Sequence, residues 1–156
     1  MSDPVLWLRL AHILGAILLF GTGLGTAFFM WRAARTGDVT AIAVTARAVV
    51  LADWLFTTPA VIAQPLTGAG LAYLLGYGMT EGWILASLGL YLLAGACWLP
   101  VVGLQLRMRR EAEAARDAGQ PLPAVWHRDM RIWFILGWPA FLAVIAILVL
   151  MVFRPG

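Results

Sequence analysis

The chain has 156 residues, of which 62% are hydrophobic and only 12% are charged. A soluble domain has about 25% charged residues, so this composition excludes a soluble protein and predicts a membrane protein. The net charge is +3, and arginine supplies all of the positive side-chain charge because the chain contains no lysine. The positions of the arginines explain this charge as membrane topology, so we expect no nucleic-acid partner.

Four apolar stretches are long enough to cross a lipid bilayer, which takes about 20 helical residues. They are residues 6–31, 49–77, 83–106 and 132–153. Each stretch is apolar on all sides, whereas the strands of a membrane β-barrel alternate between apolar and polar residues. We therefore expect one all-α domain over residues 1–156, an integral membrane four-helix bundle in contact with the lipid bilayer.

The first stretch contains His12, the only histidine in any predicted span. An ionisable residue at membrane depth indicates a functional site. Arg9 lies one turn earlier on the same helical face, and glycines from Gly15 onward would let a helix or a flat ligand approach the backbone. Tyr73 and Tyr91 reach the same depth on the second and third helices. The alternative is a purely structural role, in which a neutral His12 donates a hydrogen bond to a carbonyl or to one of these tyrosines.

The connection after the first stretch, residues 32–47, is amphiphilic, and Gly37 and Asp38 mark its turn. We expect a hinge or loop here, and a short helical lead into the second stretch is an alternative for its later part. Arginines concentrate in or beside this connection and the third one, which predicts a bacterial inner membrane protein with cytoplasmic long loops and periplasmic termini. Nine of the eleven arginines are on this side: Arg32, Arg35, Arg47, Arg107, Arg109, Arg110, Arg116, Arg128 and Arg131.

Asp53 is the only carboxylate in the second stretch, about two turns from the cytoplasmic face. A carboxylate buried alone costs several kcal/mol, so Asp53 should either pair with an arginine or keep its proton. The structural interpretation is an ion pair with Arg47 or Arg107. Gln105 lies at the same depth on the third helix. We interpret Asp53, Arg107 and Gln105 as structural polar residues.

Two prolines interrupt the second stretch and predict a kinked helix. Pro59 and Pro65 each remove a helical hydrogen bond, because proline has no backbone N–H. The side chains of Thr57, Thr58 and Gln64 are suited to satisfy the carbonyls that become free.

The inventory of metal ligands is short. Cys97 is the only cysteine, so an intrachain disulfide is impossible, and no second histidine lies in a span. A zinc site and an intramolecular bis-histidine haem are both excluded, because the spans contain too few histidine and cysteine ligands. One histidine leaves three alternatives: a single axial haem ligand, a haem shared across a dimer, or no haem.

Four sequence runs cover the apolar stretches: LFGTGLGTAFFMWRA, VVLADWLFTTPAVIAQPLTG, LYLLAGACWLPVV and WFILGWPAFLAV. These runs resemble the bacterial family of predicted integral membrane proteins called domain of unknown function 2269. More distantly, the architecture is similar to the four-helix membrane protoporphyrinogen oxidase and to copper-resistance D membrane proteins. The likeness to the oxidase implies His12 as haem ligand, and Pro139 and Arg154 match the end of its fourth helix. Where the oxidase carries a lysine, near Trp83, this chain has Ser87.

Three functions are compatible with these features. In the first, a b-type haem or porphyrin-associated redox protein, His12 ligates the haem iron and Arg9 pairs with a propionate. In the second, Asp53 and the broken second helix line a path for a small solute, a metal ion or a proton. In the third, the protein is a non-catalytic accessory subunit. Small-residue faces predict a homo-oligomer or a membrane partner subunit.

Overall fold

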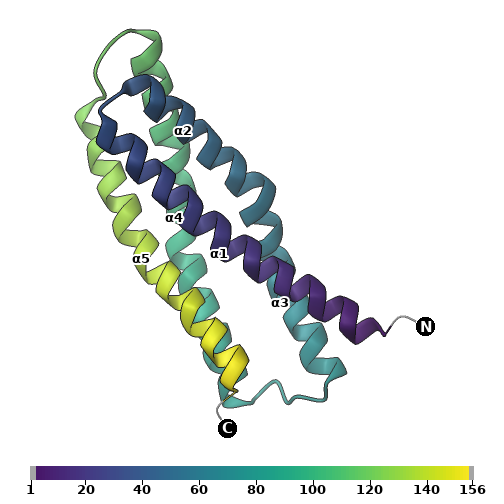
Figure 1. Cartoon of the computed structure of the whole chain (residues 1–156). Helices are drawn as coiled ribbons and strands as arrows, with labels where there is room; N and C mark the ends of the chain where they lie inside the picture. Colours follow the sequence, from purple (N-terminus) through teal and green to yellow (C-terminus); the bar gives the residue numbers. More distant parts are fainter. Residues whose placement is uncertain (1–2, 155–156) are drawn as a thin grey trace.

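The computed structural model describes residues 3–154 and is built of helices (Figure 1). The helices are α1 (Pro4–Thr36), α2 (Val39–Ala52), the π-helical turn η1 (Asp53–Thr57), α3 (Thr58–Leu74), α4 (Gly82–Asp117) and α5 (Ala124–Phe153). Because α2, η1 and α3 are continuous, four helices of the described chain are long and apolar enough to cross a membrane. The prediction of an all-α membrane bundle is confirmed.

Local sequence explains where the first helices begin and end. The Asp3 carboxylate accepts from the backbone N–H of Val5 and caps α1. Gly37 ends α1 with a positive φ of 70°, which glycine adopts without steric cost. Asp38 then caps α2 by accepting from the N–H groups of Thr40 and Ala41.

The connection predicted over residues 32–47 is much shorter in the structure. The turn at Gly37 and Asp38 is where the sequence placed it, but helix continues up to Thr36 and resumes at Val39. The loop is confined to residues 37–38, and the helical lead into the second stretch is longer than expected because α2 has an apolar face of its own. Ile42, Ala43, Ala46, Val49 and Val50 are buried there.

The hydrophobic core lies in one half of the bundle, at the end that holds the connections 37–38 and 118–123. We call this the arginine-rich end. Here α2 packs on α4, and α4 packs on α5. The largest fully buried apolar side chains are Trp126, Met30, Ile42 and Met108.

At the opposite end, where the N- and C-termini lie, the helices separate into two pairs (Figure 1). Among the described residues α3 packs on α1 and does not pack along α4 or α5. The pairs touch at mid-length, where the rings of Phe20 and Phe141 stack with centroids 5.1 Å apart. At the termini end, the Arg154 guanidinium lies over the rings of Tyr77 and Trp83. The bundle is therefore closed at the arginine-rich end and held by few contacts at the other.

Candidate functional site

Asp53 begins the π-helical turn that joins α2 to α3, and its side chain is buried. The hydroxyl of Thr57 donates to Asp53 Oδ1 at 2.8 Å, and the side chain of Gln105 on α4 lies close to this carboxyl group. Both side chains are buried and neutral. Wide π turns inside α-helices occur frequently at functional sites, because they displace side chains from the regular helical register.

The arginine expected beside Asp53 is paired elsewhere. Arg107 Nε donates to the carboxylate of Asp129 on α5, whose side chain is completely buried, and Arg128 contacts the same carboxylate at 3.4 Å. The structure gives Arg47 no ion pair among the described residues. Arg107 lies two residues after Gln105 on α4, about half a turn around the helix, and therefore faces Asp129 on α5.

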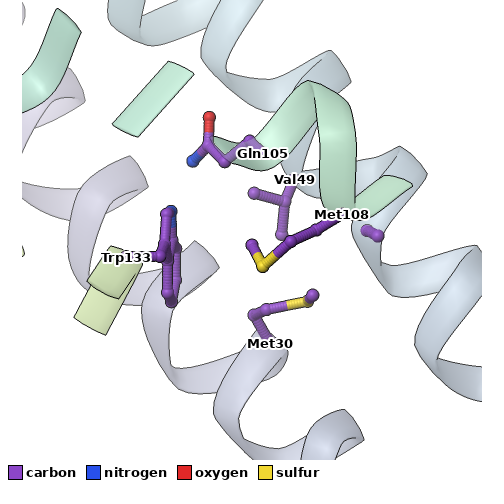
Figure 2. Close-up of a pocket in the computed structure, with 6 residues that line it drawn as sticks. Met30, Val49, Gln105, Met108 and Trp133 are labelled. Atoms are coloured by element: carbon purple, nitrogen blue, oxygen red, sulfur yellow. The ribbon is translucent and has the colours of Figure 1, made fainter. Parts of the chain in front are cut away.

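A tight pocket lies beside Gln105, between α1, α2, α4 and α5 (Figure 2). Met30 of α1, Met108 of α4 and Trp133 of α5 line it together with Gln105 and Val49, and Ala46 completes the wall. The two methionine side chains lie side by side, and the Trp133 ring turns its face toward them. The space between them is too small for a water molecule. Three helices thus place two methionine side chains beside the Trp133 ring and the Gln105 amide.

Sequence reasoning missed this pocket. Methionine usually fills gaps in a core, so neither Met30 nor Met108 stood out. The available signal was register: Gln105 and Met108 are three residues apart on α4, and Val49 and Asp53 are four apart, so each pair shares a helical face.

His12 lies in the contact between α1 and α3. Its Nδ1 is 2.8 Å from the Thr67 hydroxyl, and its ring lies over Gly68. With its amide nitrogen toward α1, Gln64 donates to His12 Nδ1 at 2.8 Å and to the His12 carbonyl at 3.1 Å, while its oxygen accepts from Ala16 N–H at 2.7 Å. Thr67 and Gln64, not a tyrosine, are the polar partners of His12.

The structure does not assemble the five residues expected around a haem. His12 and Gly15 share the contact with α3, but Gln64 occupies the space above Gly15. Tyr91 donates its hydroxyl to the Val61 carbonyl, while the Tyr73 side chain is 84% exposed. Arg9 is exposed on α1.

The hydrogen bonds of His12 bear directly on iron ligation. A donation from Gln64 makes Nδ1 an acceptor and places the ring proton on Nε2, whereas ligation through Nε2 needs that proton on Nδ1. The residues present therefore do not fit a haem in this hydrogen-bond arrangement. The described residues also contain no group of three or more His, Cys, Asp or Glu side chains that could hold a metal ion.

Comparison with known proteins identifies a family and no activity. A family model described as "Predicted integral membrane protein (DUF2269)" matches residues 6–155. No curated protein and no solved structure matches the chain.

Proposed function

We propose that this protein, which belongs to the family of predicted integral membrane proteins (DUF2269), binds and carries a small cation at Asp53. The proton is included among the candidate cations. The family description names no activity, so the proposal is based on the geometry around this carboxyl group. One observation carries it: Asp53 is buried in a membrane-spanning helix, and the polar side chains next to it are neutral.

A carboxylate without a counter-ion costs several kcal/mol in such surroundings. Asp53 must therefore be neutralised by a proton or by a bound cation. A structural role would be served better by the arginine pair that the sequence suggested, because a paired carboxylate is less costly than a lone one. The absence of an ion pair at Asp53, among the described residues, thus favours a carboxyl group that gains and loses its cation.

The π-helical turn supports the same proposal. Such turns inside membrane helices occur frequently at functional sites, since the irregular backbone displaces side chains and offers a point of bending. Asp53 and Thr57 are the first and last residues of η1, and Pro59 is the second residue of α3. Movement of α3 at this turn would change access to Asp53 while the core between α2, α4 and α5 stays intact.

Proton movement can be measured in proteoliposomes that contain a pH-sensitive dye, and uptake of the metal cations by metal analysis of the washed proteoliposomes. Parent protein is expected to move protons, or to take up Na⁺, K⁺ or Ag⁺ from the outside, and Asp53→Asn is expected to abolish the movement. Asp117→Asn, at an exposed acid, is the matched control and should behave like the parent. If parent liposomes were as tight as empty ones to all four cations, the proposal would be wrong.

A b-type haem at His12 is a second proposal, and one observation favours it. Nδ1 of His12 is held by hydrogen bonds, as is usual for histidines that bind metals through Nε2. Binding would require the ring proton to move to Nδ1 and donate to Thr67, whose own hydroxyl already donates to the Ala63 carbonyl. Haem absorbance of protein purified from haem-supplemented cells tests this role.

Membrane location and assembly are also proposals. The arginine distribution supports a bacterial inner membrane with cytoplasmic long loops and periplasmic termini, which reporter fusions after Arg116 and Arg154 would test. A homo-oligomer or a partner subunit is supported by Gly21, Gly23 and Gly25, because a Cβ atom at these positions would meet no other part of the chain within 4 Å. Crosslinking in membranes tests the oligomer.

A further inference from the structure

Another hollow lies between α1 and α2 on the outside of the bundle, and we call it the α1–α2 groove. Its volume is about 450 Å³, within the roughly 300–1,000 Å³ that is usual for small-molecule sites. Residues of α1 between Thr22 and Phe29 form one wall, and residues of α2 and η1 between Val44 and Phe56 form the other. Phe29 and Val44 are 63% and 59% exposed, so the groove is open to its surroundings. Both walls belong to candidate membrane spans, and those surroundings are therefore lipid.

The groove is lined mainly by hydrocarbon. The hydroxyl of Thr26 donates to the Thr22 carbonyl, and that of Thr45 donates to the Ala41 carbonyl, both at 2.8 Å. These two hydroxyls are thus used within their own helices and do not call for a polar ligand. Most of the remaining surface consists of small aliphatic residues and two phenylalanine rings. An extended hydrocarbon chain suits such a surface, because it needs no hydrogen-bond partner.

Positive charge adjoins the groove on the side of the arginine-rich end. Arg32 is three residues after Phe29, and Arg47 is three residues after Val44, so each arginine shares a helical face with a residue of the groove. Both arginines are exposed, and neither has an ion pair among the described residues. Asp38, the carboxylate of the connection 37–38, accepts from the backbone N–H groups that it caps. The groove therefore combines an apolar channel with cations that lack a carboxylate partner.

We propose that the α1–α2 groove binds one anionic phospholipid, whose acyl chain lies along the groove and whose phosphate lies at Arg32 and Arg47. This site is separate from cation binding at Asp53. Arginine suits phosphate because its guanidinium can donate two parallel hydrogen bonds. Basic pockets between membrane helices bind anionic lipid headgroups in the same way.

The dimensions of the groove agree with a lipid that stands parallel to the helices. From Thr22 to Phe29 the wall on α1 is roughly 10 Å long, at about 1.5 Å per residue. This is most of the depth of one leaflet, since the whole hydrocarbon core is roughly 30 Å thick. A chain that follows the wall from the arginine-rich end thus runs in the direction that acyl chains take in that leaflet.

A second copy of the chain is the competing occupant. Copies of one membrane protein cross the bilayer in the same direction, because the same arginines orient each of them. A second copy on this groove would therefore bring its own arginine-rich end next to Arg32 and Arg47. Like charges that face each other across an interface cost free energy, whereas a phosphate balances them. Charge complementarity therefore favours the anionic lipid.

Lipid retention by the purified protein tests the proposal. The protein in detergent is incubated with phosphatidylglycerol or with phosphatidylcholine of the same acyl chains, desalted, and weighed by native mass spectrometry. The parent is expected to retain a single phosphatidylglycerol per chain and little phosphatidylcholine, because the two lipids differ in headgroup charge.

Substitutions that fill the groove test the acyl-chain contact. Gly25→Leu places a side chain in the groove, and a Cβ atom at this position meets nothing within 4 Å. It should remove most of the retained phosphatidylglycerol, as should Ala48→Leu on the α2 wall. Gly21→Leu is the matched control, because a Cβ atom there also meets nothing within 4 Å but Gly21 does not line the groove. It should retain lipid like the parent.

Substitutions of the arginines test the headgroup contact. Arg32→Gln and Arg47→Gln should each weaken retention of phosphatidylglycerol about fivefold, the effect of one basic side chain near an anionic lipid surface, and leave retention of phosphatidylcholine unchanged. Arg131→Gln is the control, because Arg131 is exposed on α5, a helix that does not pack on α2 in the described chain.

Three results would overturn the site. The first is equal retention of the two lipids by the parent. The second is parent-like retention of phosphatidylglycerol in both Gly25→Leu and Ala48→Leu, which would leave the arginines as a general attraction for anionic lipid outside the groove. The third is a loss of dimer mass in these two variants without a loss of lipid, which would make a second copy the occupant of the groove.

Discussion

The hydroxyl of Tyr91 on α4 donates to the carbonyl of Val61 on α3, the acceptor that Pro65 leaves free. In a regular helix this carbonyl would accept from the N–H of the residue four positions later, and that residue is the proline. The contact is thus a side-chain replacement for a missing backbone bond. It also links α3 to α4, two helices whose backbones otherwise do not pack together in the described chain.

This relationship predicts a dependence between two substitutions. Tyr91→Phe should destabilise the bundle by about 1 kcal/mol, because a carbonyl in the membrane loses its donor. Pro65→Ala restores the helical N–H, so Tyr91→Phe should cost much less in that background. A double-mutant cycle of unfolding in mixed detergent measures the coupling. Additive effects of the two substitutions would show that Tyr91 does not replace the bond that Pro65 removes.

Substitutions of Asp53 should distinguish a neutral carboxyl group from an ion-paired one. Asp53→Asn is expected to stay within about 1 kcal/mol of the parent, since an amide is neutral and can still accept from Thr57. Asp53→Leu should cost about 1–3 kcal/mol, because the Thr57 hydroxyl loses a buried acceptor. Thermal unfolding in detergent compares the two. A large loss in Asp53→Asn would indicate a hidden cationic partner.

The ion pair at the arginine-rich end should make stability depend on acid. Asp129 precedes the membrane-spanning residues of α5, and its hydrogen bond from Arg107 lowers the pKa of the carboxyl group below its ordinary value. A lowered pKa in the folded state stabilises the protein above the ordinary carboxyl pKa of about 3.9. This contribution is lost as the pH falls through the lower, folded value.

Melting temperatures of the parent should therefore decrease steeply below about pH 4, and Asp129→Asn should melt lower at neutral pH with a weaker acid dependence. Asp117→Asn is the control, because Asp117 is exposed and, among the described residues, pairs with neighbouring Arg116 alone. Parallel acid profiles for the parent and Asp129→Asn would contradict this assignment.

Much of the fold could be predicted from sequence because bilayer thickness imposes strict length and hydrophobicity on each helix. The apolar helices and the turn at Gly37 follow from such local rules. These features depend on one helix at a time or on rise per residue along it.

Rotation of each helix about its axis could not be predicted in the same way. Whether Arg107 faces Asp53 or Asp129 depends on how α4 packs against α2 and α5, and both acids lie within reach by depth alone. The same is true of Gln64, which was expected to satisfy its own helix but bonds the backbone of α1. In lipid, apolar residues surround the whole helix, so hydrophobic periodicity does not reveal the inner face.

The glycines of α1 and α3 provide a test of the helix contact at His12. A Cβ atom at Gly68 would lie 3.2 Å from His12 Cε1, whereas at Gly21 it would meet nothing within 4 Å. Gly68→Ala should displace the ring and destabilise the bundle, while Gly21→Ala should leave the monomer unchanged or more stable by about 0.5–1 kcal/mol, since alanine favours helix. Unfolding measured at low protein concentration compares the two variants.

The final prediction concerns His12 itself and separates a ligand from a packing residue. If His12 binds haem iron, protein purified with ample haem should show the Soret absorbance, and His12→Ala should lose it while remaining folded. Thr67→Val should weaken haem retention, because the Nδ1 proton then lacks its acceptor and the ring is less well held. Arg9→Ala, which removes the expected propionate partner, should weaken retention without abolishing it.

If the parent carries no haem, His12→Ala should instead cost only about 1 kcal/mol of stability for lost hydrogen bonds to Thr67 and Gln64. Equal haem content in parent and His12→Ala would reject the ligand role and leave His12 as a polar contact between α1 and α3.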